Sequence, residues 1–271
     1  MTITLIIGKD SNLSKYLVNT IDNSILISSR ELQQNIDILS EYKEKKINLI
    51  FNNFQSSTLL NKLDNSVEYI SNTILVTAKI LEYFRGCNIS KIIYTSSSSV
   101  YGNNISCKES DTLKPLNLHA SLKVANEKLI EKYSSERNID YSITRIFNMY
   151  GGEDRFSIIS KILKAIKSKK AITIVNHGNA IRDFIYIEDV AAIYKKILTT
   201  NVKIINIGTG EGVSIKTLID FLSNRGITLK VNNISKDELK ISTADTVLLS
   251  KLIGIISFKH VEEYLVKELK L

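Results

Sequence analysis

A histidine and a lysine stand four residues apart in the stretch "PLNLHASLKVANEKL", which begins at Pro115. Positions four apart on a helix lie one turn apart on the same face, so His119 and Lys123 would project into a shared space. An imidazole accepts or donates a proton near neutral pH, and a neighbouring positive charge lowers its pKa. The pair predicts either a proton-transfer site or a solvated edge of a helix.

A turn near the N-terminus could bind a phosphate group. In "LIIGKDSNLSKYL" we expect a strand to end at Gly8 and a helix to begin soon after, where dinucleotide-binding folds bring backbone amides to a pyrophosphate. The glycines of such folds would fall at Gly8, Ser11 and Ser14, and only the first is glycine. Ser11 would have to accept backbone geometry that glycine adopts more freely. We expect Gly8, Ser11, Asn12 and Leu13 to bind the cofactor, with an ordinary turn as the alternative.

The end of the second expected strand indicates which dinucleotide would bind. Dinucleotide folds often place an acidic residue there for the ribose hydroxyls, but this chain has Ser28, Ser29 and Arg30. Hydroxyls and a guanidinium suit a 2′-phosphate, which favours NADP over NAD; a surface arginine at a helix start is the alternative. The other cofactor-binding candidates in this half of the chain are Asp37 and Asn53.

Alternating strand and helix patterns must position these residues. The strand-like runs are "TITLIIG", "SILIS", "INLIFNN", "KIIYTSSSS" and "DYSITRIFN", and helical patterns fall at about 12–22, 66–86 and 118–137. Strand and helix in alternation predict an α/β protein with a doubly wound parallel (Rossmann) sheet.

The pattern becomes less regular after about residue 150. Helices are expected near 155–168, 188–198 and 214–225, between short strands such as "AITIV" and "KIINIG". We predict a dinucleotide-binding domain over 1–150 and a smaller C-terminal substrate-binding lobe over 151–271. Segments at about 180–210 are expected to return to the first domain.

Composition narrows the classes of function. The net charge of +8 comes from scattered lysines without a dense basic run, which does not favour nucleic-acid binding. The two cysteines are expected to be reduced thiols in a cytoplasmic protein, and the three histidines lack the spacing of a metal site. The N-terminus reads as a buried strand rather than a signal peptide, and no apolar run approaches the roughly 18 residues of a membrane helix.

Five segments occur in an order that carries a family resemblance. After "KIIYTSSSSVYG" come "PLNLHASLK", "TRIFNMYGG", "RDFIYIEDVA" and "INIGTGEGVSIKTL". At these residues the chain resembles the extended short-chain dehydrogenase/reductase family, which includes nucleotide-sugar epimerases, dehydratases and reductases. The resemblance runs from Gly8 to about Leu252. It implies a nicotinamide cofactor, a nucleotide-diphosphate sugar as substrate, and a homodimer paired through the helices at about 66–86 and 118–137.

The resemblance also assigns roles to residues. Ser97 holds the position of the hydroxyl that binds the sugar oxygen, and Lys123 that of the lysine that holds the nicotinamide ribose and lowers the pKa of the neighbouring acid/base. The remaining matches are expected near cofactor or substrate. Asn72 matches the family's helix asparagine, Phe147 is expected on the cofactor side, and Arg145 is expected near cofactor and sugar. Ser98, Asn148 and Arg182 are expected to bind the sugar nucleotide.

The chain departs from the family at His119, where the family has tyrosine. Tyrosine needs positive neighbours to bring its pKa toward neutrality, whereas histidine begins near 6.5 and the same neighbours would leave it neutral. Three interpretations stay open: His119 replaces the tyrosine as acid/base, the relay lies elsewhere with Tyr101 or Ser97 as donor, or the active site has been lost.

The residues after the expected catalytic hydroxyl select among the reactions of the family. Its dehydratases have an acidic pair there, and this chain has Ser98 and Ser99, which argues against dehydration. With Arg30 favouring NADP, we predict an NADP-dependent reductase of a nucleotide-activated 4-keto, 6-deoxy sugar in surface-polysaccharide biosynthesis. The alternatives are an NAD-dependent nucleotide-sugar 4-epimerase and a catalytically inactive dimeric scaffold of the same fold.

Overall fold

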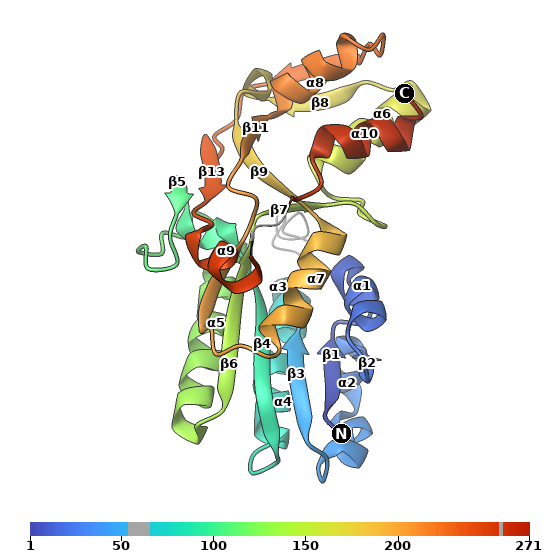
Figure 1. The fold of residues 1–271 in the computed structure, drawn as a ribbon. Helices are drawn as coiled ribbons and strands as arrows, with labels where there is room; N and C mark the ends of the chain where they lie inside the picture. The colour runs from blue at the N-terminus through green and yellow to red at the C-terminus, as the bar shows by residue number, and fades with distance from the viewer. Residues whose placement is uncertain (54–65, 255–256) are drawn as a thin grey trace. The chain divides into compact units, whose positions relative to one another are not determined.

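The computed structural model describes residues 1–53, 66–254 and 257–271 (Figure 1). By internal contacts the chain divides into two compact units. Unit 1 comprises Met1–Val100, Pro115–Arg145 and Ala191–Ile205, and unit 2 comprises Tyr101–Lys114, Ile146–Val190 and Asn206–Leu271. The functional division predicted at about residue 150 stays a prediction.

A six-stranded sheet forms the centre of unit 1, in the order β10-β6-β4-β3-β1-β2. Its strands are β1 (Ile3–Ile7), β2 (Ser24–Ile27), β3 (Ile47–Phe51), β4 (Ile89–Ser97), β6 (Asp140–Ile146) and β10 (Ile204–Ile207). β1 pairs in parallel with β2 and β3, and β3 pairs in parallel with β4. The predicted α/β class with a doubly wound parallel sheet is confirmed.

Continuous apolar runs explain why these strands lie inside. The runs at the ends of β1 and β3 are fully buried, as expected for parallel strands covered on both faces. The helical elements are α1 (Asn12–Thr20), α2 (Ser29–Gln34), the 3-10 helix η1 (Ile36–Tyr42), α3 (Ser66–Ile70), the π-helical turn η4 (Ser71–Leu75), α4 (Val76–Tyr83), α5 (Leu118–Arg137) and α7 (Ile187–Ile197).

Helix α5 carries polar groups on its buried face. The side chain of Asn117 accepts a hydrogen bond from the amide of Ala120 at 2.9 Å and caps the helix start, and Asn138 ends the helix in the left-handed conformation. The face that packs on β4 buries Lys123 and Glu127 together with apolar residues. A long helix with charges on its inner face is positioned for chemistry rather than for packing alone.

The apolar spacing in α4 serves the core of this chain. Val76, Ile80 and Leu81 are fully buried in the cluster that covers the sheet of unit 1. Their spacing therefore supplies no argument for pairing with a second chain, and the homodimer stays a prediction.

Unit 2 is built around Asp183, which is fully buried at the middle of β9. Its carboxylate accepts hydrogen bonds from the backbone amides of Thr209 at 2.8 Å, Gly210 at 2.9 Å and Ala244 at 3.1 Å. These bonds join three segments far apart in the sequence. Burial raises the pKa of Asp183, and the hydrogen bonds from these amides oppose that rise.

The strands of unit 2 form two sheets, in the orders β11-β9-β13-β5, with β7 paired to β9, and β12-β8. They are β5 (Asn104–Cys107), β7 (Asn148–Tyr150), β8 (Ile172–Val175), β9 (Ile181–Tyr186), β11 (Gly212–Ser214), β12 (Val231–Ile234) and β13 (Ile241–Ala244). The helical elements are η5 (Ser98–Tyr101), which begins in unit 1, α6 (Ile158–Ser168), η6 (Asn176–Gly178), α8 (Ile215–Ser223), α9 (Val247–Ile253) and α10 (Val261–Leu269).

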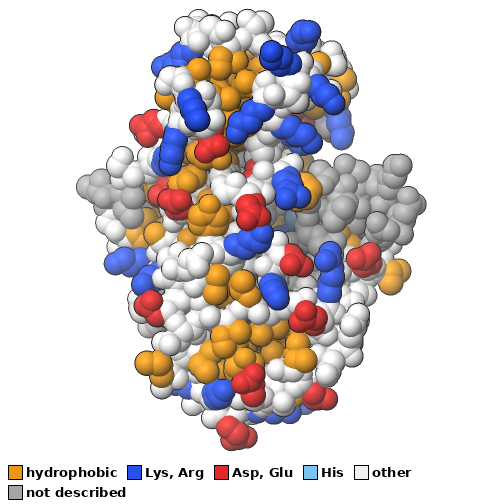
Figure 2. Space-filling model, turned by 90° about the vertical axis from the view of Figure 1, so that its right-hand side faces the viewer, with side chains coloured by type: hydrophobic (Ala, Val, Ile, Leu, Met, Phe, Trp, Pro, Cys, Tyr) orange, Lys and Arg blue, Asp and Glu red, His pale blue; other side chains and the backbone are white. Residues whose placement is uncertain are grey.

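Basic side chains are interspersed with acidic and hydrophobic ones on the face drawn in Figure 2. Within the described residues, no helix combines the length and the apolar character needed to cross a bilayer.

Candidate active site

The lysine of the predicted pair is buried in unit 1. Lys123 is 4 % exposed, and its Nζ donates a hydrogen bond of 2.6 Å to the carbonyl oxygen of Thr95 on β4. Burial lowers the pKa of Lys123 to about 7, although Glu127, one turn along α5, acts in the opposite direction. Taking an ammonium out of water is costly, so the alternative of a solvated helix edge does not hold for this residue.

The histidine of the pair lies one turn earlier and is half-buried. Its Nδ1 lies 3.5 Å from the hydroxyl oxygen of Tyr69 on α3, and the two ring centroids are 6.3 Å apart. Burial first, and the charge of Lys123 second, lower the pKa of His119 to about 4. The imidazole is therefore neutral at physiological pH, where it can accept a proton. Its neutrality was expected from the lysine, but burial is the larger cause.

The predicted serine lies on the same strand that the lysine contacts. Ser97 is the last residue of β4, two residues after the carbonyl that accepts from Lys123. Its hydroxyl is half-buried and accepts a hydrogen bond of 3.2 Å from the backbone amide of Ser99. Ser98 is buried at the start of η5. The three predicted catalytic residues therefore all lie in unit 1, on α5 and at the carboxyl end of β4.

A buried ion pair joins α5 to β6. Glu127 and Arg145 are each 3 % exposed in their side chains, and Nη2 of the arginine lies 2.8 Å from the carboxylate. Nε of the arginine adds a hydrogen bond of 3.2 Å to the same carboxylate, which also accepts from the hydroxyl of Ser96. Arg145 thus ties α5 to the sheet, and its predicted position near cofactor and sugar stays a prediction.

The helix asparagine, Asn72, lies in the π-helical turn η4. A π turn leaves carbonyls without their usual helical partners. Nδ2 of Asn53 donates to the Asn72 carbonyl at 2.7 Å, and Nδ2 of Asn126 donates to the Thr73 carbonyl at 3.2 Å. The side chain of Gln33 donates to Oδ1 of Asn72. The buried Oδ1 atoms of Asn53 and Asn126 have no hydrogen-bond partner among the described residues.

The turn after β1 begins at Gly8 and has serines at the two later positions where a dinucleotide-binding turn would have glycine. Gly8 has φ +108°, and a Cβ there would lie 2.7 Å from the Asn52 carbonyl carbon, so no other residue fits. Ser11 has φ −67° and ψ 137°, an ordinary extended conformation, so the expected strain is absent. Nδ2 of Asn52 donates to the hydroxyls of Ser11 and Ser14, each at 2.9 Å. Asn12 and Leu13 form the first turn of α1.

The residues predicted to select NADP lie on the surface of unit 1. Arg30 is exposed and pairs with Asp10 of the first turn at 3.6 Å. Ser29 begins α2, while Asp37 accepts a hydrogen bond of 3.0 Å from the hydroxyl of Tyr83. Both side chains of this pair are mostly exposed, so the pair is weak and the contact of Arg30 with a 2′-phosphate stays a prediction.

The remaining predicted residues lie in unit 2. Phe147 is buried, and Nδ2 of Asn148 donates to the Asp183 carbonyl at 3.2 Å. Arg182 is half-buried and pairs with Glu238 at 3.3 Å. Tyr101, the possible substitute donor, is buried and donates to Oδ1 of Asn206 at 2.7 Å. Its hydroxyl thus serves a structural contact within unit 2.

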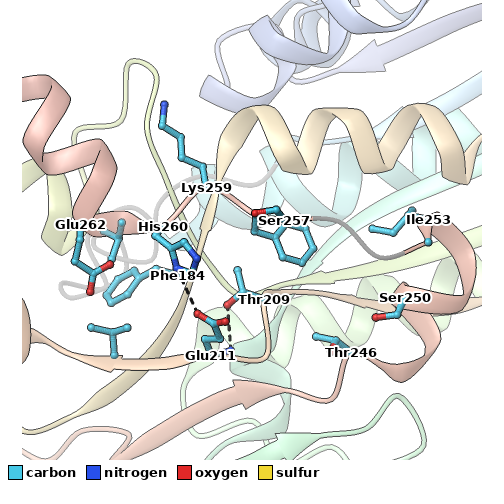
Figure 3. Close-up of a pocket in the computed structure, with 14 residues that line it drawn as sticks. Phe184, Thr209, Glu211, Thr246, Ser250, Ile253, Ser257, Lys259, His260 and Glu262 are labelled. Carbon is cyan, nitrogen blue, oxygen red and sulfur yellow. Dashed lines mark hydrogen bonds and ion pairs between the residues drawn. The ribbon is translucent and has the colours of Figure 1, made fainter.

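Unit 2 also contains a cavity lined by none of the predicted residues (Figure 3). Its walls include Phe184, Thr209 and Thr246, and across it Glu211 pairs with Nδ1 of His260 at 3.4 Å. Both side chains of this pair are more than half exposed, so the pair contributes little to stability. Among the residues that the structure describes, no group of three or more His, Cys, Asp or Glu side chains could hold a metal ion.

Two residues of unit 1 were missed in the sequence. Tyr69 and Glu127 have no motif of their own: the first meets His119 from 50 positions away, and the second is one of many glutamates. The position of Glu127, one turn after Lys123, is the signal that could have identified it.

The chain matches a known protein family over more than half of its length. The model of the "NAD dependent epimerase/dehydratase family" matches residues 21–208, a span that begins after the first turn. Protein CapI of Staphylococcus aureus is 29 % identical over 252 residues, covering 81 % of this chain and 75 % of that protein. A UDP-glucuronate 4-epimerase of Thermodesulfobacterium geofontis is 31 % identical over 202 residues, covering 71 % of this chain and 62 % of that protein.

Solved structures show the same fold. The UDP-glucuronic acid 4-epimerase of Bacillus cereus, solved with UDP-glucuronic acid and NAD, superposes with a TM-score of 0.88 at 23 % identity. The match covers all of this chain and 98 % of that one.

Proposed function

Because the chain belongs to the NAD dependent epimerase/dehydratase family, we propose that it is a nucleotide-sugar 4-epimerase that uses NAD. The observation that carries the proposal is the placement of a neutral His119 beside a buried Lys123 on α5, with Ser97 at the end of β4. Relatives named as 4-epimerases support this alternative more than the reductase first predicted.

The residues of unit 1 fit a dinucleotide. Gly8 leaves the backbone open at the end of β1, and the Ser11 side chain makes no capping bond to the first turn of α1. That turn contains no acidic residue, so the positive end of the helix dipole is available to a pyrophosphate. We propose that Gly8 and the backbone at 11–13 hold the pyrophosphate and that Lys123 holds the nicotinamide ribose. When bound, NAD supplies a reversible hydride acceptor.

The side chains of the chain itself manage the proton. The Ser97 hydroxyl positions the oxygen on C4 of the sugar, and His119 accepts the proton of that oxygen as the sugar is oxidised and returns it as the sugar is reduced. The neutral imidazole is the accepting form throughout the physiological range, although a pKa of about 4 makes it a weak base. Asn148 and Arg182 are proposed to bind the sugar nucleotide, and Ser98 to line the sugar site.

Dehydration and reduction receive less support. No carboxylate follows Ser97, where a dehydratase would need its acid and base, because Ser98 and Ser99 occupy those positions. The argument for an NADP-dependent reductase depends on the exposed Arg30, whereas the Bacillus cereus 4-epimerase was solved with NAD. A role in surface-polysaccharide biosynthesis, a cytoplasmic location and a homodimer stay predictions.

The experiment is a chromatographic assay of the purified protein with NAD and a panel of UDP-sugars. We expect the C4 epimer of one of them to form, with Lys123→Met abolishing turnover. Lys128→Met is the matched control, because Lys128 lies on the same helix but is exposed. Turnover retained in Lys123→Met would refute the assigned site, and the absence of any epimer together with absent NAD binding would favour the inactive scaffold.

A further inference from the structure

If His119 holds the position of the family's tyrosine, as the sequence predicts, its second ring nitrogen has to be accounted for. A tyrosine has a single polar atom, whereas an imidazole has two, and a base that works at one nitrogen needs the other held in a defined protonation state. Nδ1 of His119 lies 3.5 Å from the hydroxyl oxygen of Tyr69. The atom that could hold the ring is therefore present in unit 1 itself.

Tyr69 is fixed in place by its surroundings. Its side chain is 1 % exposed, and its carbonyl accepts a hydrogen bond of 2.7 Å from the hydroxyl of Thr73 in the π-helical turn η4. The same turn contacts α5 and is tied to the end of β3 through the side chain of Asn53. The hydroxyl of Tyr69 therefore lies near His119 on a segment that is buried and hydrogen-bonded.

The charges around the pair favour neutral partners. Burial raises the pKa of Tyr69, so its hydroxyl stays protonated, and burial together with Lys123 lowers the pKa of His119. The charge of Lys123 acts on His119 and favours the neutral imidazole. A neutral imidazole carries one proton, and which nitrogen carries it is set by the hydrogen bond at the other.

We propose that Tyr69 is a positioning residue whose hydroxyl oxygen accepts a hydrogen bond from Nδ1–H of His119 and so reserves Nε2 for the sugar oxygen. The inference rests on the proposed function, in which His119 is the base. When Nε2 takes the sugar proton, Nδ1–H keeps its bond to Tyr69 and the imidazolium is stabilised. When Nε2 returns the proton, the ring is restored, so no other proton has to move.

A spectroscopic test separates this inference from the proposed function. The ¹⁵N NMR shifts of His119 report which nitrogen carries the proton whether or not the protein turns over a sugar. In the wild type we expect a protonated Nδ1 and an unprotonated Nε2, and in Tyr69→Phe a mixture of the two tautomers. A wild-type ring protonated at Nε2, or a spectrum unchanged in Tyr69→Phe, would overturn the role of Tyr69.

Kinetics provide the second readout. The hydrogen bond from Nδ1–H to Tyr69 becomes charge-assisted, and therefore stronger, when the imidazolium forms, so Tyr69→Phe should lower kcat by roughly ten- to a hundredfold with KM little changed. Tyr133→Phe is the matched control, because Tyr133 lies on α5 and its hydroxyl has no partner among the described residues. A KM change with kcat unaltered, or an equal loss in the control, would contradict the inference, and the NMR spectrum of each variant reports whether it is folded.

Discussion

Replacing Lys123 by methionine should make the protein more stable while it removes the function. The side chain is almost fully buried, and burial lowers its pKa from the ordinary 10.5 to about 7. Each pKa unit corresponds to 1.36 kcal/mol, so at pH 7 the buried lysine costs the folded state on the order of 4 kcal/mol. Methionine has a similar length and no charge. Loss of the hydrogen bond to the Thr95 carbonyl offsets about 1 kcal/mol of the gain, which leaves about 3 kcal/mol.

The stabilisation should depend on pH in a defined direction. Between pH 7 and 10.5 the unfolded chain binds a proton at Lys123 that the folded chain does not bind, so the stability of the wild type rises with pH across this interval. The advantage of Lys123→Met should therefore be largest at or below pH 7, and near pH 10.5 only the loss of the hydrogen bond should remain, so that the wild type is there the more stable protein by up to about 1 kcal/mol. Taking the difference between the two proteins cancels the titration of all other groups.

Urea denaturation at several pH values measures the effect. Lys128→Met is again the control, since this exposed lysine on α5 should change the free energy of unfolding by less than about 0.5 kcal/mol at every pH. A Lys123→Met protein that is less stable than the wild type at pH 7 would refute the reasoning. So would a stability difference that does not vary with pH.

Substitutions at three further residues test the packing and the site. Glu127→Ala leaves the Arg145 guanidinium buried without its carboxylate and should lower the free energy of unfolding by roughly 3–5 kcal/mol in urea denaturation; Lys128→Ala, one position on, should not. Gly8→Ala places a Cβ against the Asn52 carbonyl and should weaken NAD binding in a fluorescence titration by at least about tenfold (1.4 kcal/mol), and unaltered affinity would argue against the pyrophosphate site. His119→Tyr should keep or raise epimerase turnover, while His119→Ala should abolish it; indifference to both would move the proton relay elsewhere.

Periodicity was sufficient for the sheet of unit 1. The end of β3, residues 49–51, is a continuous apolar run because both faces of a parallel strand are covered, and that pattern is visible without a structure. In unit 2 the run "AITIV" predicted β8, but the pairing of the other short strands was not predicted, for the opposite reason. β9 pairs with three strands from distant segments, and its pairing depends on the buried Asp183 rather than on local propensity.

Site residues that are close in the sequence could be predicted to lie together. Site residues that approach each other only through tertiary packing could not. The spacing of His119 and Lys123 is local, so a helix was enough to bring them together. The approach of Tyr69 to His119 depends on how α3 and the π-helical turn pack, and no spacing encodes it.

The most direct test of the 4-epimerase uses a UDP-sugar labelled with deuterium at C4, incubated with the protein and NAD and followed by NMR. Oxidation and return of the same hydride would give the C4 epimer with its deuterium retained. The account predicts this product from UDP-glucuronic acid or UDP-glucose. An unchanged sugar in the presence of bound NAD, or an epimer that has lost the label, would contradict it.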